Sequence, residues 1–93
     1  MIKSFSDKTT VGIWKGDFLR RLPEALALKA VEKLQLLDAA TRLEDLFFPP
    51  SNGFHRLVGN RAGWYSIKVN NKWRLIFTWT EGGPAIVALV DYH

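Results

Sequence analysis

Residues 64–80, WYSIKVNNKWRLIFTWT, constrain the fold of this 93-residue chain more than any other stretch. Two runs rich in β-branched and aromatic residues flank Asn70-Asn71, and such runs favour β-strands. Asparagine tolerates a positive φ, so the Asn-Asn pair predicts a two-residue turn between antiparallel strands. The stretch is therefore predicted to be a β-hairpin at the centre of a sheet.

A two-residue turn determines which side chains share a face of the hairpin. It pairs Ile67 with Arg74 and Ser66 with Leu75. One face then carries Trp64, Ser66, Lys68, Trp73, Leu75, Phe77 and Trp79. The other carries Tyr65, Ile67, Val69, Arg74, Ile76 and Thr78. We expect the tryptophan-rich face to pack on helices, and Arg74, a guanidinium on a mostly apolar face, to require a partner or a function.

Composition narrows the class of protein. With 47% hydrophobic and 24% charged residues, residues 1–93 are predicted to form a single domain. The chain has no cysteine and two histidines, which argues against disulfides and against a metal site. It has neither a signal-peptide pattern nor an apolar run of about 18 residues, so we expect a cytoplasmic protein without membrane contact. A net charge of +4 favours a polyanionic partner, although an ordinary soluble surface accounts for it equally well.

Two helices are predicted before the hairpin. Ser6 or Asp7 can cap a short first helix with Val11, Trp14 and Phe18 on one face. The second helix is predicted from Pro23 to about Ala40. Its buried stripe comprises Leu26, Ala27, Ala30, Val31, Leu34 and Leu37. The run Thr41–Glu44 matches a capping box and predicts one further short helical turn.

Strands are predicted on both sides of the hairpin in sequence. Residues 54–58 and the apolar run 85–90 have strand character, and Ile2–Phe5 could pair at an edge. Helices followed by a run of strands indicate an α+β fold. We expect two N-terminal helices packed on a small, mostly antiparallel sheet of four to five strands.

The residues that could carry chemistry are scattered along the chain. No common nucleotide-binding or hydrolase motif is present. The candidates that remain are His55, Arg74, Asp91, Tyr92 and His93, which a curled sheet could bring to one concave face. This set suits metal-free RNA cleavage, which needs a base for the 2′-hydroxyl, a cation for the phosphorane and an acid for the departing 5′-oxygen.

Simpler interpretations stay open on pattern alone. His55 could be a surface histidine, Arg74 could pair with Asp91 to hold the last strand, and His93 could be a frayed tail.

Four basic residues are candidates for RNA binding: Arg56, Arg61, Lys68 and Lys72.

A family resemblance adds to this interpretation. The run HRLVGNRAGWYSIKVNNKWRLIFTW from His55 to Trp79, followed by a terminal VDYH, is similar to the HigB toxins of the RelE/ParE toxin superfamily. The opening MIKSF and the helical LQLLDAATRLEDL before a proline-containing loop resemble the same family. The likeness covers essentially the whole chain.

The resemblance implies a RelE-like fold and the toxin of a bacterial type II toxin–antitoxin system. Such a toxin cleaves mRNA at the translating ribosome without a metal or other cofactor. A HigA-like helix-turn-helix antitoxin neutralises it, and the complex of the two binds operator DNA. The resemblance also assigns roles within the candidate set: Arg74 stabilises the scissile phosphate, His55 and His93 share acid and base duties, Asp91 orients a histidine or acts as base, and Tyr92 positions or stacks the substrate base. The hairpin face bearing Tyr65, Ile67 and Arg74 is then the predicted RNA-facing side.

One position departs from the family pattern. Val58 stands where members often carry lysine, and it cannot stabilise a phosphate, so Arg56 or Lys68 would have to substitute. This favours, as an alternative, a toxin that binds the ribosome or RNA and perturbs translation or ribosome maturation with little or no cleavage. A third interpretation is an inactive structural partner of the antitoxin.

Overall fold

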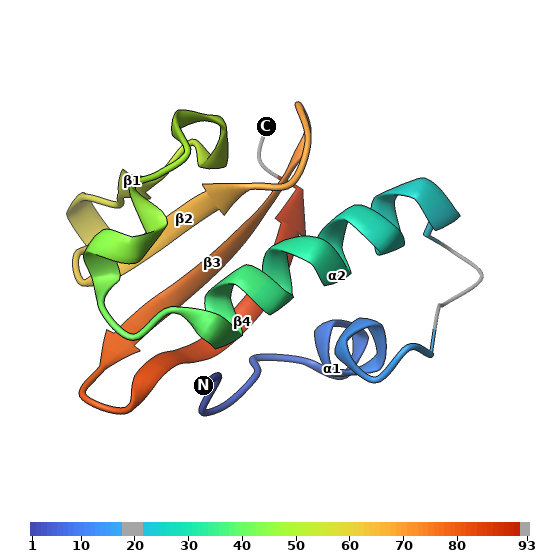
Figure 1. Ribbon diagram of the computed structural model, residues 1–93, viewed down its shortest axis with the longest axis horizontal. Helices are drawn as coiled ribbons and strands as arrows, with labels where there is room; N and C mark the ends of the chain where they lie inside the picture. Colours follow the sequence, from blue (N-terminus) through green and yellow to red (C-terminus); the bar gives the residue numbers. More distant parts are fainter. Residues whose placement is uncertain (18–21, 92–93) are drawn as a thin grey trace.

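The computed structural model describes residues 1–17 and 22–91. Its four-stranded sheet comprises β1 (His55–Arg56), β2 (Trp64–Lys68), β3 (Trp73–Thr80) and β4 (Gly83–Asp91), in that spatial order and antiparallel throughout. Two helices, α1 (Lys8–Trp14) and α2 (Glu24–Ala39), lie against β4 and β3 (Figure 1). The predicted α+β fold is therefore confirmed.

The short helix α1 begins where its cap predicts. The Asp7 carboxylate accepts a hydrogen bond of 2.8 Å from the backbone N–H of Thr10, which satisfies an N–H group at the start of the helix. Its fully buried side chains are Thr10 and Ile13, whereas the predicted Val11 and Trp14 are half-buried. Phe18, the third member of the predicted face, lies outside the described residues.

Helix α2 supplies the largest share of the helical core. Pro23 is its N-cap, so the helix starts at Glu24, one position after the predicted start. The predicted stripe is confirmed by the buried Leu26, Ala27, Ala30, Leu34 and Leu37, while Val31 is half-buried. Burying apolar surface of this kind contributes about 25 cal/mol per Å² removed from water. The stripe therefore fixes which face of the sheet is covered.

The hairpin has a longer turn than predicted. Lys68 lies opposite Arg74, and Ile67 lies opposite Leu75, so residues 70–72 form a three-residue loop. The Asn70 side-chain oxygen accepts hydrogen bonds of 2.8 Å from the N–H groups of both Lys72 and Trp73. Asparagine commonly closes a turn through its own side chain in this way. The prediction of a two-residue turn was wrong.

This one-residue shift reverses the predicted faces of β2. Ile67, Leu75 and Phe77 are fully buried together beneath the helices, and Tyr65 packs against the same core. On the opposite face of the sheet, Arg74 lies with three residues of β2: Trp64, Ser66 and Lys68. Because successive strand residues alternate sides, a slip of one residue transfers a whole set of side chains. Arg74 is therefore on the face away from the helices, but Tyr65 and Ile67 are not beside it, and that part of the prediction was wrong.

The chain outside the hairpin only partly follows the predicted strands. The N-terminal segment makes a single parallel bridge, from Phe5 to Val87, at the outer edge of β4. The predicted strand 54–58 is shorter in the structure, as β1, and the predicted strand 85–90 is longer, as β4.

Among the described residues, no helix is long and apolar enough to cross a membrane.

Two short 3₁₀ turns, η1 (Leu43–Leu46) and η2 (Pro50–Asn52), connect α2 to β1, and a third, η3 (Gly59–Arg61), lies between β1 and β2. In the predicted capping box, Asp45 rather than Glu44 is the acidic partner. Its carboxylate accepts hydrogen bonds from the backbone N–H groups of Thr41 (3.0 Å) and Arg42 (3.1 Å). These bonds lower the pKa of Asp45 from 3.8, since they stabilise the ionised form.

Candidate functional site

A basic cavity of about 440 Å³ lies on the sheet face away from the helices. We call it the cationic pocket; its lining residues are His55, Arg56, Leu57, Val58, Arg61, Ser66 and Arg74. Three guanidinium groups and an imidazole line it, and none of the described lining residues is acidic. Clustered charges of one sign in a concave site concentrate oppositely charged ligands. The arrangement suits a phosphate group.

Among the described residues, Arg74 is held in the pocket by hydrogen bonds to Gly53 and Ser66. Its Nη1 donates to the backbone carbonyl of Gly53 at 2.8 Å and to Ser66 Oγ at 3.0 Å. Ser66 is 1% exposed and lies on the neighbouring strand, so its hydroxyl is a fixed acceptor. A guanidinium oriented by the protein can engage two phosphate oxygens at once without first losing rotamer freedom.

The loop before β1 positions the carbonyl that Arg74 uses. Asn52 is 1% exposed, and its amide donates to the backbone carbonyls of Leu46 (3.3 Å) and Phe48 (3.0 Å). Its side-chain oxygen accepts a bond of 3.2 Å from Lys33 Nζ on α2. Buried polar groups are costly unless they are paired, so this network fixes the loop against α2. Gly53 is the next residue, so the same network also fixes the position of its backbone carbonyl.

We expect Gly53→Ala to impair the site as well as the fold. Gly53 has φ 56° and ψ 42°, a left-handed conformation that costs a non-glycine residue roughly 1–2 kcal/mol. A Cβ at this position would lie 3.2 Å from Lys68 Cβ and 3.3 Å from Arg74 Nη2. Urea denaturation should show the stability loss, and the affinity of the cationic pocket for inorganic phosphate should fall because Arg74 is displaced.

Gly16→Ala is the matched control for this substitution. Gly16 has φ 86°, but a Cβ there would meet nothing within 4 Å, and the residue follows α1 away from the pocket. It should lose similar stability and keep its full affinity for phosphate. Equal binding by the two variants at matched stability would contradict a role for Gly53 in placing Arg74.

The structure gathers some of the predicted site residues and separates others. His55 and Arg74 line the same pocket with Arg56 and Arg61, and Lys68 lies directly across from Arg74 on β2. His55 is exposed on β1, directly opposite Ser66.

Asp91 and Lys72 lie together at the hairpin end of the sheet. They form an ion pair of 3.8 Å, and Asp91 is opposite Trp73, while Val90 is opposite Arg74. Neither Asp91 nor Lys72 is a lining residue of the cationic pocket. Tyr92 and His93 lie outside the described residues. The predicted roles of all these residues remain predictions.

Sequence reasoning missed Ser66, Gly53 and Asn52 as the groups that position Arg74. A serine within an otherwise apolar strand was a usable signal, since a buried hydroxyl requires a partner. Nothing in the sequence linked Gly53 to a residue 21 positions away. Within residues 1–17 and 22–91, no group of three or more His, Cys, Asp or Glu side chains is placed to hold a metal ion.

Comparison with known proteins gives relatives that extend over the whole chain. Toxin HigB-1 of Vibrio cholerae serotype O1 is 42% identical over 94 residues, covering 100% of this chain and 98% of that protein. Endoribonuclease HigB of Proteus vulgaris is 31% identical over 93 residues, covering 100% of both.

Solved structures share the fold at lower identity. YafQ from E. coli superposes with a TM-score of 0.69 over 98% of this chain and 91% of YafQ, at 18% identity. A chain of the YoeB–YefM complex from Staphylococcus aureus gives 0.65 over 100% and 98%, also at 18% identity. The sequence model of the family described as "RelE-like toxin of type II toxin-antitoxin system HigB" matches residues 3–93. The chain therefore belongs to the HigB-like toxins, the RelE-like toxins of type II toxin–antitoxin systems.

Proposed function

We propose that this toxin is a metal-independent endoribonuclease that cleaves mRNA at the translating ribosome. The observation that carries the proposal is the cationic pocket, in which Arg74 is held by Gly53 and Ser66 and His55 stands exposed at the rim. The relative from Proteus vulgaris is named an endoribonuclease, which supports the same activity here.

The proposed reaction is an internal transfer at one phosphodiester. The 2′-oxygen bonds to phosphorus, the bond from phosphorus to the 5′-oxygen breaks, and a 2′,3′-cyclic phosphate and a 5′-hydroxyl result. A base takes the 2′-hydroxyl proton, and an acid gives a proton to the departing 5′-oxygen. Arg74 stabilises the extra negative charge on the phosphorane oxygens, a contribution available only in the transition state.

The proton carriers are assigned to three residues. His55 and His93 share the acid and base duties, and Asp91 orients a histidine or acts as base. Tyr92 positions or stacks the substrate base, as aromatic side chains do with unpaired RNA. The roles of Tyr92 and His93 rest on the family resemblance, whereas that of His55 also rests on its place in the pocket.

The proposed partners follow from the family. A HigA-like helix-turn-helix antitoxin neutralises the toxin in the cytoplasm, and operator DNA is contacted only through that complex. The YoeB chain that shares this fold was solved with YefM, which supports an antitoxin partner. Arg56, Arg61, Lys68 and Lys72 bind RNA phosphates, with the first two lining the pocket and Lys68 beside it.

A second candidate function is supported by Val58. This side chain is 83% exposed and lines the cationic pocket, so the pocket has an apolar group where another cation would assist cleavage. A toxin with this pocket could bind the ribosome or RNA and perturb translation while cutting little.

Mapping RNA ends after toxin induction separates the two functions. We expect new 5′-hydroxyl ends inside codons of translated messages, and none in a message whose start codon has been removed. In a purified system, cleavage should require programmed ribosomes. It should persist at the same rate when the toxin is stripped of metal by a chelator, and the chelator removed, before the toxin is added to ribosomes in Mg²⁺ buffer. Growth arrest without new ends would reject the nuclease and favour the binding toxin.

A further inference from the structure

A second and larger cavity, of about 720 Å³, adjoins the cationic pocket. We call it the aromatic pocket; its lining residues are Phe47, Pro50, Gly53, Phe54, His55 and Arg56. His55 and Arg56 line both cavities, so the two meet at β1. A single ligand can therefore place an anionic group in the cationic pocket and a neighbouring group in the aromatic pocket.

The wall of the aromatic pocket is a chain of ring contacts that ends in the core. The ring centroids of Phe47 and Phe54 are 4.8 Å apart, and Phe54 stacks on Tyr65 at 5.8 Å with an interplanar angle of 19°. Tyr65 in turn contacts the fully buried Phe77 at 6.1 Å. The Arg56 guanidinium lies 5.6 Å from the centre of the Tyr65 ring, as in a cation–π contact. Rings held in this way are a rigid stacking surface.

We propose that the aromatic pocket binds an unpaired nucleobase of the same RNA whose phosphate lies in the cationic pocket. This inference rests on the proposed function and adds a nucleobase site to it, separate from the Tyr92 stacking discussed above. A nucleotide combines the two chemistries that the adjoining cavities offer, a planar ring for Phe47 and Phe54 and an anion for Arg56 and Arg74. Splayed-out bases characteristically stack on protein aromatics while their phosphates contact arginine.

Charge favours RNA over a protein segment as the occupant. The shared rim is formed by Arg56 and His55, and no described lining residue of either cavity is acidic. The pocket also offers few groups to read a base edge, since the Gly53 carbonyl accepts from Arg74 and the Gly53 N–H donates to Pro50. Stacking strength should therefore determine base preference, with purines favoured over pyrimidines but no single base required.

The test uses the full chain and a short single-stranded RNA that cannot be cleaved. Its riboses carry 2′-O-methyl groups, and one base is 2-aminopurine, whose fluorescence is quenched when it stacks. Titration at low salt should quench the fluorescence with the unaltered protein. Phe47→Leu, which keeps apolar bulk but removes the ring, should weaken binding by about 5- to 100-fold and abolish the quenching.

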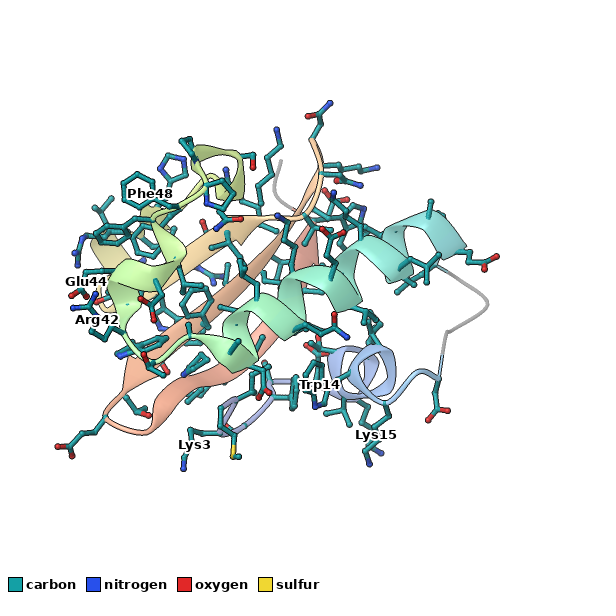
Figure 2. All side chains as sticks on the ribbon, viewed as in Figure 1. Lys3, Trp14, Lys15, Arg42, Glu44 and Phe48 are labelled. Atoms are coloured by element: carbon teal, nitrogen blue, oxygen red, sulfur yellow. The ribbon has the colours of Figure 1, made fainter. Side chains whose placement is uncertain are left out.

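Phe48→Leu is the matched control. Phe48 is the next residue and is 72% exposed, on the loop beside β1 (Figure 2), but it is not a lining residue of the aromatic pocket. It should leave affinity and quenching unchanged. Phe47→Trp, which retains a stacking surface, should restore quenching and keeps the test decisive if Phe47→Leu proves unstable.

An abasic RNA completes the cycle. Removing the base should weaken binding to the unaltered protein as much as Phe47→Leu does, and the two changes together should weaken it no more than either alone.

Two outcomes of these measurements overturn the proposal: no quenching with the unaltered protein, or additive losses of affinity from Phe47→Leu and the missing base. So does a Phe47→Leu variant that quenches normally but binds the antitoxin less tightly, because the cavity then belongs to a protein contact. If the toxin cleaves RNA but shows no Phe47-dependent quenching, the base site in the aromatic pocket is rejected and the nuclease function is retained. If quenching is seen but the toxin cleaves no RNA, the base site is retained and the nuclease function is rejected.

Discussion

Replacing Arg74 with lysine is expected to slow RNA cleavage by about 100- to 1,000-fold, the range found when one preorganised transition-state donor is removed. Lysine keeps the positive charge but lacks the planar pair of N–H groups that engages two oxygens at once. Its single nitrogen would also have to serve Gly53, Ser66 and the phosphate together, whereas Arg74 donates to Gly53 and Ser66 from Nη1 alone. The measurement is the single-turnover rate on programmed ribosomes, with RNA binding determined separately.

Arg42→Lys is the matched control for this experiment. Arg42 is an exposed arginine that forms an ion pair of 3.9 Å with Asp45 on η1, and it does not line the cationic pocket. We expect it to cleave at the normal rate. Arg74→Lys should stay folded, because losing the hydrogen bonds to Gly53 and Ser66 costs only about 0.5–1.5 kcal/mol each. A folded Arg74→Lys protein with the normal rate would remove Arg74 from the mechanism.

His55→Gln is expected to lower the cleavage rate by about 100- to 10,000-fold, the usual contribution of a positioned acid or base. Glutamine has similar size and polarity but cannot carry a proton at neutral pH. RNA affinity should change little, because the arginines of the pocket are retained. The loss should therefore fall on the chemical step.

Asn60→Ala provides the comparison, since Asn60 is an exposed residue of η3 beside the pocket-lining Arg61. It should leave the cleavage rate unchanged. If His55→Gln instead weakens binding and leaves the chemical step intact, His55 binds RNA and does not transfer protons.

Local signals were sufficient for the helices and the order of the strands. The Asp7 cap and the leucine stripe of α2 depend on residues within a turn or two of one another, so the sequence predicted both. The α+β architecture followed from helices preceding strands. By contrast, the shortening of β1 to two residues depends on its neighbours, because β1 pairs with β2 only at His55 and Arg56.

The candidate site was predictable only in part. His55 and Arg74 could be chosen by chemistry, and they do line one pocket. The carbonyl and hydroxyl that hold Arg74 come from a loop 21 residues away and from the adjacent strand, so no local pattern could predict them. The aromatic pocket is a similar case, because Phe47 and Phe54 meet only after the intervening prolines and Asn52 fold the loop back on itself.

The sequence by itself determined the central hairpin, the two helices, the basic character and the family likeness of this toxin, because these depend on residue type and short-range spacing. Tertiary structure decided which face of the hairpin each side chain occupies. The Asn70 side chain closes a three-residue turn and shifts the strand register by one residue. Since strand side chains alternate, that shift buries Ile67 and Tyr65 against the helices and leaves Ser66 beside Arg74. The turn and the packing of Ile67 and Tyr65 against the helices together select this register, and the register determines which residues surround the guanidinium.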